Sequence, residues 1–116
     1  MLHKNLEVWK KSIHLVVTIY TETKNFPPEE RFGLSQQMRR AAVSVPSNIA
    51  EGAARRSQNE LRQFLYISLG SLAELETQLL ISSELGFSSA QAGKIDDEIS
   101  QIRKMLQSII HKLSPP

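Results

Sequence analysis

Arginines gather in the middle of this sequence, where they could bind phosphate groups. Residues 31–73 hold six arginines against Glu51 and Glu60, a net charge of +4, whereas the whole chain carries +2. Such a cluster indicates either a phosphate-contacting surface or a set of structural arginine–glutamate pairs. No aromatic residue is interleaved with the candidate cations, so base stacking is not indicated. The candidate nucleic-acid contacts are Arg40, Arg55, Arg56, Lys10 and Lys11.

The sequence holds few of the other groups that carry out chemistry. There is no cysteine, and His3, His14 and His111 are not at the helical spacings that bind a metal ion. The five glycines are isolated, so no glycine-rich phosphate loop is present. No serine–histidine–aspartate set can be argued either. We therefore expect a protein without enzyme activity, metal or cofactor.

Helical periodicity dominates the chain that must position these residues. The 116 residues, of which 41% are hydrophobic and 22% charged, suffice for one domain with its own core. Apolar residues recur at steps of three and four in four segments, about 5–24, 30–54, 58–85 and 89–113. Helices joined by short loops predict an all-α fold, an up-down-up-down antiparallel four-helix bundle, as a single domain over residues 1–116.

Local signals in the sequence mark the helix ends. Ser57-Gln58-Asn59-Glu60 is a capping box that starts the third helix, and Gly86 suits a left-handed residue after its end.

No unbroken apolar run approaches the ~20 residues of a membrane-spanning helix. The N-terminal stretch MLHKNLEVWKK is too charged for a signal peptide. We therefore expect a cytoplasmic protein without membrane contact.

The second and third helices are predicted to form a hairpin that fixes two ion pairs. With the turn near residues 56–57, facing residues have numbers that sum to about 113. Arg39 then faces Glu74, and Glu51 faces Arg62, so these four are predicted to be structural ion pairs. The same register leaves the two arginines at the turn without a partner.

Two of the predicted helices carry more apolar surface than one core requires. In the first helix, the core stripe is predicted to be Leu6, Trp9, Ile13, Val16, Val17 and Tyr20. A second apolar stripe lies on the opposite side of that helix, and the third helix has an apolar arc of similar excess. A patterned excess of apolar residues on two helices predicts that the protein is a homo-oligomer. The candidate interface residues are Val8, Leu15, Ile19, Tyr66, Leu69 and Leu80.

The second helix also carries a motif. The stretch from Phe32 to Gly52, with Leu6-Glu7-Val8-Trp9, Gly70-Ser71-Leu72 and Leu85-Gly86-Phe87, resembles the bacterial four-helix-bundle proteins encoded within intervening sequences of large-subunit ribosomal RNA genes. The resemblance implies an up-down bundle that assembles as a ring-shaped homopentamer. It also implies similarity to the accessory proteins of diversity-generating retroelements, which are pentameric barrels that bind nucleic acid and a reverse transcriptase.

Two functions remain open at this point. The first is an RNA-binding or DNA-binding adaptor that acts through phosphate contacts on a basic surface. The second is a protein-interaction scaffold, for example for a polymerase or reverse transcriptase, without direct nucleic-acid binding. An apolar patch left exposed after oligomerisation would favour the scaffold, with Phe26 and Phe87 in the loops as its candidates.

Overall fold

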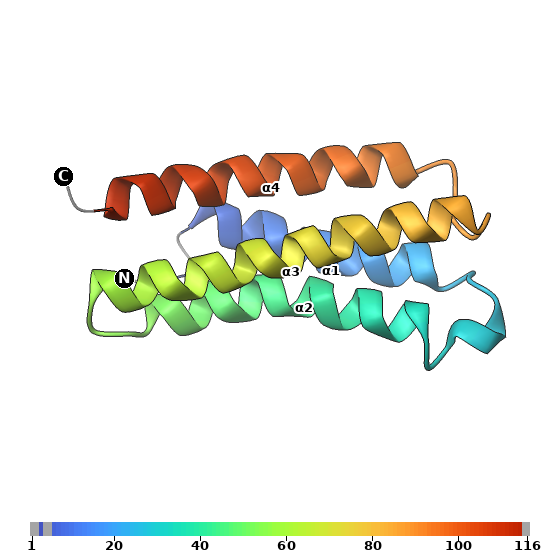
Figure 1. Ribbon diagram of the computed structural model, residues 1–116, viewed down its shortest axis with the longest axis horizontal. Coiled ribbons are helices and arrows are strands. Elements are labelled where there is room, and N and C mark those ends of the chain that lie inside the picture. Colours follow the sequence, from blue (N-terminus) through green and yellow to red (C-terminus); the bar gives the residue numbers. More distant parts are fainter. Residues whose placement is uncertain (1–2, 4–5, 115–116) are drawn as a thin grey trace.

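The chain folds into four long helices that run back and forth along one axis. The computed structural model describes residue 3 and residues 6–114 (Figure 1). The elements are α1 (Glu7–Thr23), the short 3-10 helix η2 (Pro28–Glu30), α2 (Leu34–Ala53), α3 (Gln58–Glu84) and α4 (Ala92–Leu113). Within these described residues there is no strand, and the predicted all-α four-helix bundle is confirmed.

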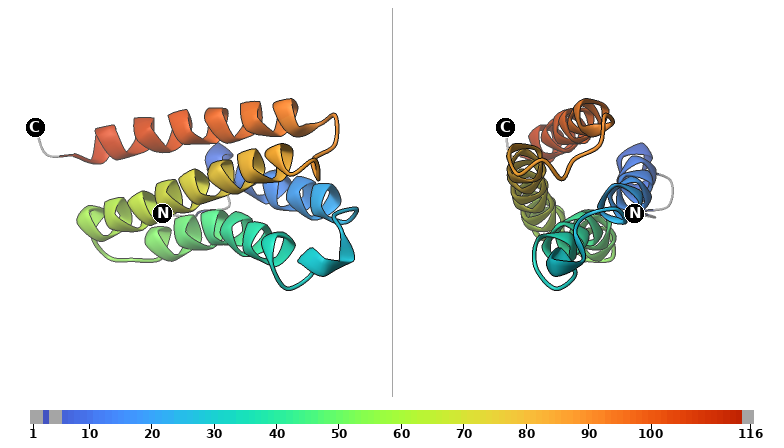
Figure 2. Two further views of the ribbon diagram at one scale, coloured as in Figure 1. Left: turned by 45° about the vertical axis from the view of Figure 1, so that its right-hand side comes forward. Right: turned by 90° about the vertical axis from the view of Figure 1, so that its right-hand side faces the viewer.

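The four helices occupy the corners of an elongated bundle that measures 46 × 22 × 20 Å. Each helix packs against the next one in the chain, and α4 returns to α1. The end-on view in Figure 2 shows that α1 and α3 lie at diagonally opposite corners. The α1–α2 and α3–α4 faces therefore lie on opposite sides of the bundle.

The start of the second helix differs from the prediction. It was expected near residue 30, but α2 begins at Leu34 because the prolines before it start the separate turn η2. The Glu30 carboxylate then accepts the backbone N–H of Leu34 at 3.1 Å. A Cβ on Gly33 would lie 2.9 Å from that same carboxylate oxygen. Glycine at this position therefore leaves room for the Glu30 carboxylate to cap the N-terminus of α2.

The two helix ends that local signals predicted are confirmed. The backbone N–H of Glu60 donates to the Ser57 hydroxyl at 3.1 Å, which satisfies one of the free donors at the start of α3. Gly86 follows the end of α3 with a φ of +77°, in the left-handed region that favours glycine. The first predicted helix start, at residue 5, lies outside the described residues.

The inner face of α1 is rotated from the predicted one, although Leu6, Trp9 and Val16 of the predicted stripe still pack against the core. Val8, Leu15 and Ile19, proposed above for an oligomer interface, are at most 1% exposed and belong to the core. In the predicted core stripe, Ile13 is 40% exposed and Val17 is 61% exposed. Both stripes are apolar at helical spacing, so periodicity alone could not decide which one faces the bundle.

Small polar residues complete the buried face of α1. The Ser12 hydroxyl donates to the carbonyl of Trp9 at 2.7 Å, and the Thr23 hydroxyl donates to the carbonyl of Ile19 at 2.8 Å. Their hydroxyls are satisfied within the helix, so these side chains can be buried without an unpaired polar group. This is why a stripe that includes serine and threonine could become the inner face.

The α2–α3 hairpin confirms its predicted register. The Ser68 hydroxyl donates to the carbonyl of Val45 at 2.9 Å, and the hydroxyls of Ser44 and Ser71 share a hydrogen bond of 2.8 Å. Small residues on both helices allow a close approach. Nearer the turn, a Cβ on Gly52 would lie 2.8 Å from the Cβ of Phe64, so the two backbones could not approach this closely with a larger residue there.

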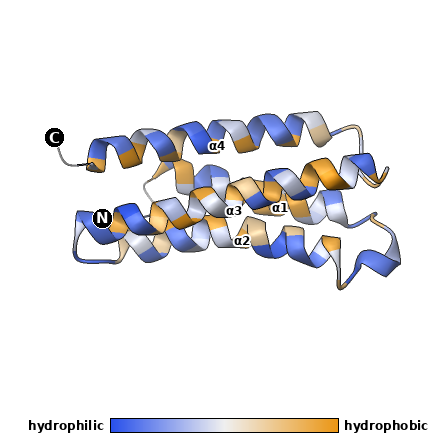
Figure 3. Cartoon of the chain, in the orientation of Figure 1, coloured by the Kyte–Doolittle hydropathy of each residue, from blue (hydrophilic) through white to orange (hydrophobic). Residues whose placement is uncertain are grey.

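The outer surface of α3 is unusually apolar. By length and composition alone it is the one helix among the described residues that could cross a membrane, and a single helix of this kind is weak evidence for a membrane span. One third of the residues in that window, 33%, are buried inside the bundle. Figure 3 shows apolar residues along most of the visible length of α3. The large exposed apolar residues of this helix are Tyr66, Ile67, Leu80 and Ile81, and Leu85 follows at its C-cap.

Candidate nucleic-acid interface

A cavity of about 580 Å³ opens between the C-terminal half of α1 and the N-terminal half of α2. Every charged residue that lines it is an arginine, and two aromatic rings lie beside these arginines. We call this cavity the basic groove. Its lining residues are Tyr20, Arg31, Phe32, Gln36, Arg39, Arg40, Val43 and Ser44.

Arg39 forms the floor of the basic groove by bridging α1 and α2. Its Nε–H donates to the Thr23 hydroxyl at 2.9 Å, and Nη2 donates to the carbonyl of Tyr20 at 3.4 Å. Its guanidinium also lies 4.5 Å from the centre of the Tyr20 ring. The predicted Arg39–Glu74 pair is therefore wrong. The hairpin register predicts the position of a residue along the bundle axis but not the direction of its side chain. The Arg39 side chain points to α1, and Glu74 is exposed to solvent.

The rim of the basic groove carries the two arginines that remain exposed. Arg31 follows η2 directly, and its guanidinium lies 5.4 Å from the centre of the Phe32 ring. Phe32 is 78% exposed, the largest value among the exposed large hydrophobic residues. Arg40 is exposed on α2. Among the described residues, neither Arg31 nor Arg40 makes an ion pair.

The sequence predicts no aromatic residue among the candidate cations, but Arg40 lines the groove together with Tyr20 and Phe32. Tyr20 comes from another helix, so its place beside Arg39 and Arg40 could not be read from the sequence. Phe32 stands next to Arg31 in the chain, between the two prolines and Gly33. Phe26 in the same connection is buried, so the position of Phe32 in a turn did not by itself reveal that its ring is exposed.

The arginines at the α2–α3 turn lie at the other end of the bundle. Arg55, predicted to be free, donates to Glu51 at 2.6 Å and lies 4.9 Å from the centre of the Phe64 ring. Arg62 donates instead to the side chain of Asn59 at 2.6 Å, so the predicted Glu51–Arg62 pair is wrong. Both arginines hydrogen-bond to side chains one helical turn away in the chain.

The remaining predicted cations are dispersed. Arg56 is exposed at the α2–α3 turn, and Lys10 pairs with Glu7 at 3.4 Å. Lys11 is half-buried beside His14, on the side of α1 that faces α4. Both lysines lie in the N-terminal half of α1, away from the basic groove. Of the five predicted contacts, only Arg40 lines the groove.

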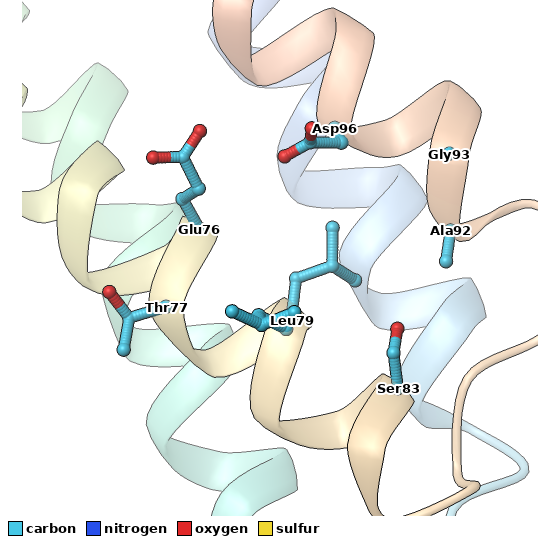
Figure 4. Close-up of a pocket in the computed structure, with 8 residues that line it drawn as sticks. Glu76, Thr77, Leu79, Ser83, Ala92, Gly93 and Asp96 are labelled. Atoms are coloured by element: carbon cyan, nitrogen blue, oxygen red, sulfur yellow. The ribbon is translucent and has the colours of Figure 1, made fainter.

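A hollow on the opposite side of the bundle is lined by acidic side chains. The hollow between α3 and α4 has a volume of about 450 Å³, and its charged lining residues are Glu76 and Asp96 (Figure 4). Glu76 also accepts a hydrogen bond from Arg103 across this pair of helices. The α1–α2 side therefore presents positive charge and the α3–α4 side presents more negative charge. The described residues contain no group of three or more side chains that could hold a metal ion.

Two loop residues proposed for a partner surface are packed instead. Phe26 is only 6% exposed and its ring centre lies 5.7 Å from that of Phe87, which is half-buried. Together they cover the end of the core where the α1–α2 and α3–α4 connections meet. On α3, Leu69 is half-buried against the core, whereas Tyr66 is 56% exposed and Leu80 is 62% exposed.

Comparisons with known proteins agree with this bundle. The chain matches a solved structure from Bacteroides thetaiotaomicron, described as a protein with unknown function from the S23 ribosomal protein family. The two share 28% sequence identity over 89% of this chain and 97% of the other, with a TM-score of 0.79. No curated protein matches the sequence. The family model described as 23S rRNA-intervening sequence protein matches residues 4–108, and the chain belongs to this family.

Proposed function

We propose that this protein is a non-enzymatic adaptor that binds RNA through the phosphate backbone, at the basic groove. The observation that carries the proposal is that all three charged residues of this cavity are arginines. Arginine presents a planar fork of donors that matches a phosphate group. Arg31 and Arg40 are free to turn toward a ligand, while Arg39 is held in place by α1.

The charge distribution of the bundle supports the same site. A polyanion approaching the protein is attracted more to the α1–α2 side than to the α3–α4 side, where Asp96 adds negative charge and Glu76 is paired with Arg103. The description of the family, which connects it with 23S rRNA, favours ribosomal RNA as the probe. Contacts to phosphate predict weak sequence preference and strong salt dependence.

The salt dependence can be estimated from the number of arginines. Two to three phosphate contacts per subunit on single-stranded RNA should lower the affinity by roughly 7- to 20-fold between about 50 and 200 mM salt, from a slope of about 0.7 per contact. An oligomer that engages one long RNA through several subunits would show a steeper fall. A short RNA that reaches a single subunit therefore gives the clearest value.

The experiment compares charge reversals at matched arginines. Arg40→Glu changes an exposed arginine in the basic groove, and Arg56→Glu changes an exposed arginine at the other end of the bundle. RNA affinity is measured by fluorescence anisotropy at low salt, after circular dichroism has shown that both variants are folded. We expect a large loss for Arg40→Glu and a small one for Arg56→Glu. A larger loss for Arg56→Glu than for Arg40→Glu would place the site at the α2–α3 turn. If both variants bound RNA as tightly as the wild type, both sites would be rejected.

We further propose that the protein is a homo-oligomer that buries the outer surface of α3. The sequence from Gln63 to Ala73 contains no charged residue, and five large apolar side chains lie exposed on this helix and its C-cap. Exposed apolar area of this extent is typical of interfaces. The number of five subunits remains a prediction from the resemblance.

Leu80→Glu tests the oligomer, because its side chain is 62% exposed and contributes little to the core. Light scattering after size-exclusion chromatography should give a multiple of 13.1 kDa for the wild type and a smaller mass for the variant. A wild-type mass of one subunit at all concentrations would contradict self-association. The apolar surface would then suit a different protein partner, as in the scaffold hypothesis.

A further inference from the structure

The basic groove contains one feature that phosphate binding alone does not require. Phe32 is 78% exposed, and the Arg31 guanidinium lies over its ring, 5.4 Å from the ring centre. Tyr20 is less exposed, at 44%, and the Arg39 guanidinium over its ring is held by the hydrogen bond to Thr23. Among the described residues the Arg31 side chain, by contrast, makes no hydrogen bond or ion pair and can turn away from Phe32. Phe32 is therefore the open aromatic surface of the groove.

The segment that carries Phe32 is held by its own hydrogen bonds. The Gly33 N–H donates to the carbonyl of Glu30 at 3.0 Å, and the Glu30 carboxylate accepts the N–H of Leu34 at 3.1 Å. The Arg31 N–H donates to the carbonyl of Pro28 at 3.1 Å. A hydrogen bond thus lies on each side of Phe32 in the chain. An exposed ring on a fixed backbone can take a stacking partner with little loss of conformational freedom.

We propose that the basic groove selects single-stranded RNA, with an unpaired base stacked on the Phe32 ring and adjacent phosphates on Arg31 and Arg40. This inference rests on the proposed RNA binding at the same groove. Bases in a duplex already stack on their neighbours, whereas the bases of a loop or single strand present a free face to an aromatic ring. The arginines alone would accept both forms.

The chemistry of the groove favours RNA over an acidic protein segment. An acidic peptide would use the arginines but would leave the aromatic ring exposed to water. A nucleotide carries an anionic phosphate and a flat base in one unit, so it matches both features of the groove. The cavity volume of about 580 Å³ lies within the range of ligand-binding cavities. Because stacking is tolerant of base identity, we expect little preference among sequences.

The test uses substitutions at Phe32 and two forms of the same RNA. Phe32→Leu retains an apolar side chain without a π face, and Phe32→Trp retains a π face. Affinities for a single strand of about ten nucleotides and for its duplex are measured by anisotropy at one salt concentration. The exposure of Phe32 makes unfolding by either change unexpected, and circular dichroism checks this.

The wild type should bind the single strand more tightly than the duplex. Phe32→Leu should lower the single-strand affinity by about 5- to 150-fold and leave the duplex affinity nearly unchanged, whereas Phe32→Trp should retain the preference. Equal affinities for both RNA forms, or equal binding by Phe32→Leu and the wild type, would overturn the stacking inference. If Arg40→Glu still abolished binding, the proposed RNA interface would survive that result. Absence of RNA binding by the wild type would reject both, and so would tighter binding of an acidic peptide than of RNA.

Discussion

Leu15 and Val17 lie two residues apart on α1, and the structure gives them opposite roles. Leu15 is fully buried in the core, whereas Val17 is 61% exposed. The sequence pattern indicates the reverse, because Val17 belongs to the stripe predicted to face the bundle. Replacing each residue by alanine therefore tests the orientation of α1 directly.

The expected costs follow from burial. Leu15→Ala removes a buried side chain and leaves a cavity, which costs about 2 to 5 kcal/mol of unfolding free energy. That is a large share of the roughly 5 to 15 kcal/mol that holds a small domain together. It corresponds to a fall in melting temperature of about 8 to 20 °C. Val17→Ala changes an exposed position, so the unfolding free energy of one subunit should change by less than about 0.5 kcal/mol.

Urea denaturation gives both values in one assay. Far-ultraviolet circular dichroism follows the helices, and Trp9, the only tryptophan, gives an independent fluorescence signal. Because self-association would add stability that depends on protein concentration, each variant is measured at several concentrations and the comparison is made at the lowest. If Val17→Ala cost as much as Leu15→Ala there, the orientation of α1 described above would be wrong.

Three further substitutions test the contacts that position the groove and the helices, each by the same urea denaturation. Gly52→Ala should destabilise the fold by about 1 to 3 kcal/mol, because its Cβ would lie 2.8 Å from that of Phe64; an unchanged stability would contradict the close approach of α2 and α3. Gly86→Ala should cost about 1 to 2 kcal/mol because φ is +77° there, and a neutral result would mean that the turn adjusts. Arg39→Lys should cost about 1 kcal/mol or more, since an ammonium group cannot reproduce both the Thr23 hydrogen bond and the stacked plane; equal stability would argue against the bridge.

The parts of the fold that the sequence predicts well are those set by neighbouring residues. Ser57 and Glu60 are three positions apart, and Gly86 needs only its own backbone conformation, so both helix ends could be located. The α2–α3 hairpin follows from one short turn between two patterned helices, which fixes the height of each residue to within a few positions.

The wrong predictions have a different origin. In each case the local sequence is compatible with more than one arrangement, and only the packed bundle decides between them. The α1 pattern has two apolar stripes, and only the packing of the other three helices selects between them. Arg39 could reach either α1 or α3, and the hairpin register does not contain the information about α1. The basic groove joins residues 20 and 39 from two helices, so it exists only after the bundle has formed.

The proposed RNA interface is tested most directly by the salt dependence of binding in variants that remove charge. The affinity for a short single-stranded RNA is measured at several salt concentrations for the wild type, for Arg31→Gln combined with Arg40→Gln, and for Arg56→Gln as the matched control. We expect the slope of log affinity against log salt, which is negative, to become shallower by about 1.4 in the double variant, which is about 0.7 per lost phosphate contact. Arg56→Gln should leave the slope unchanged. An unchanged slope in the double variant would contradict phosphate binding at the basic groove.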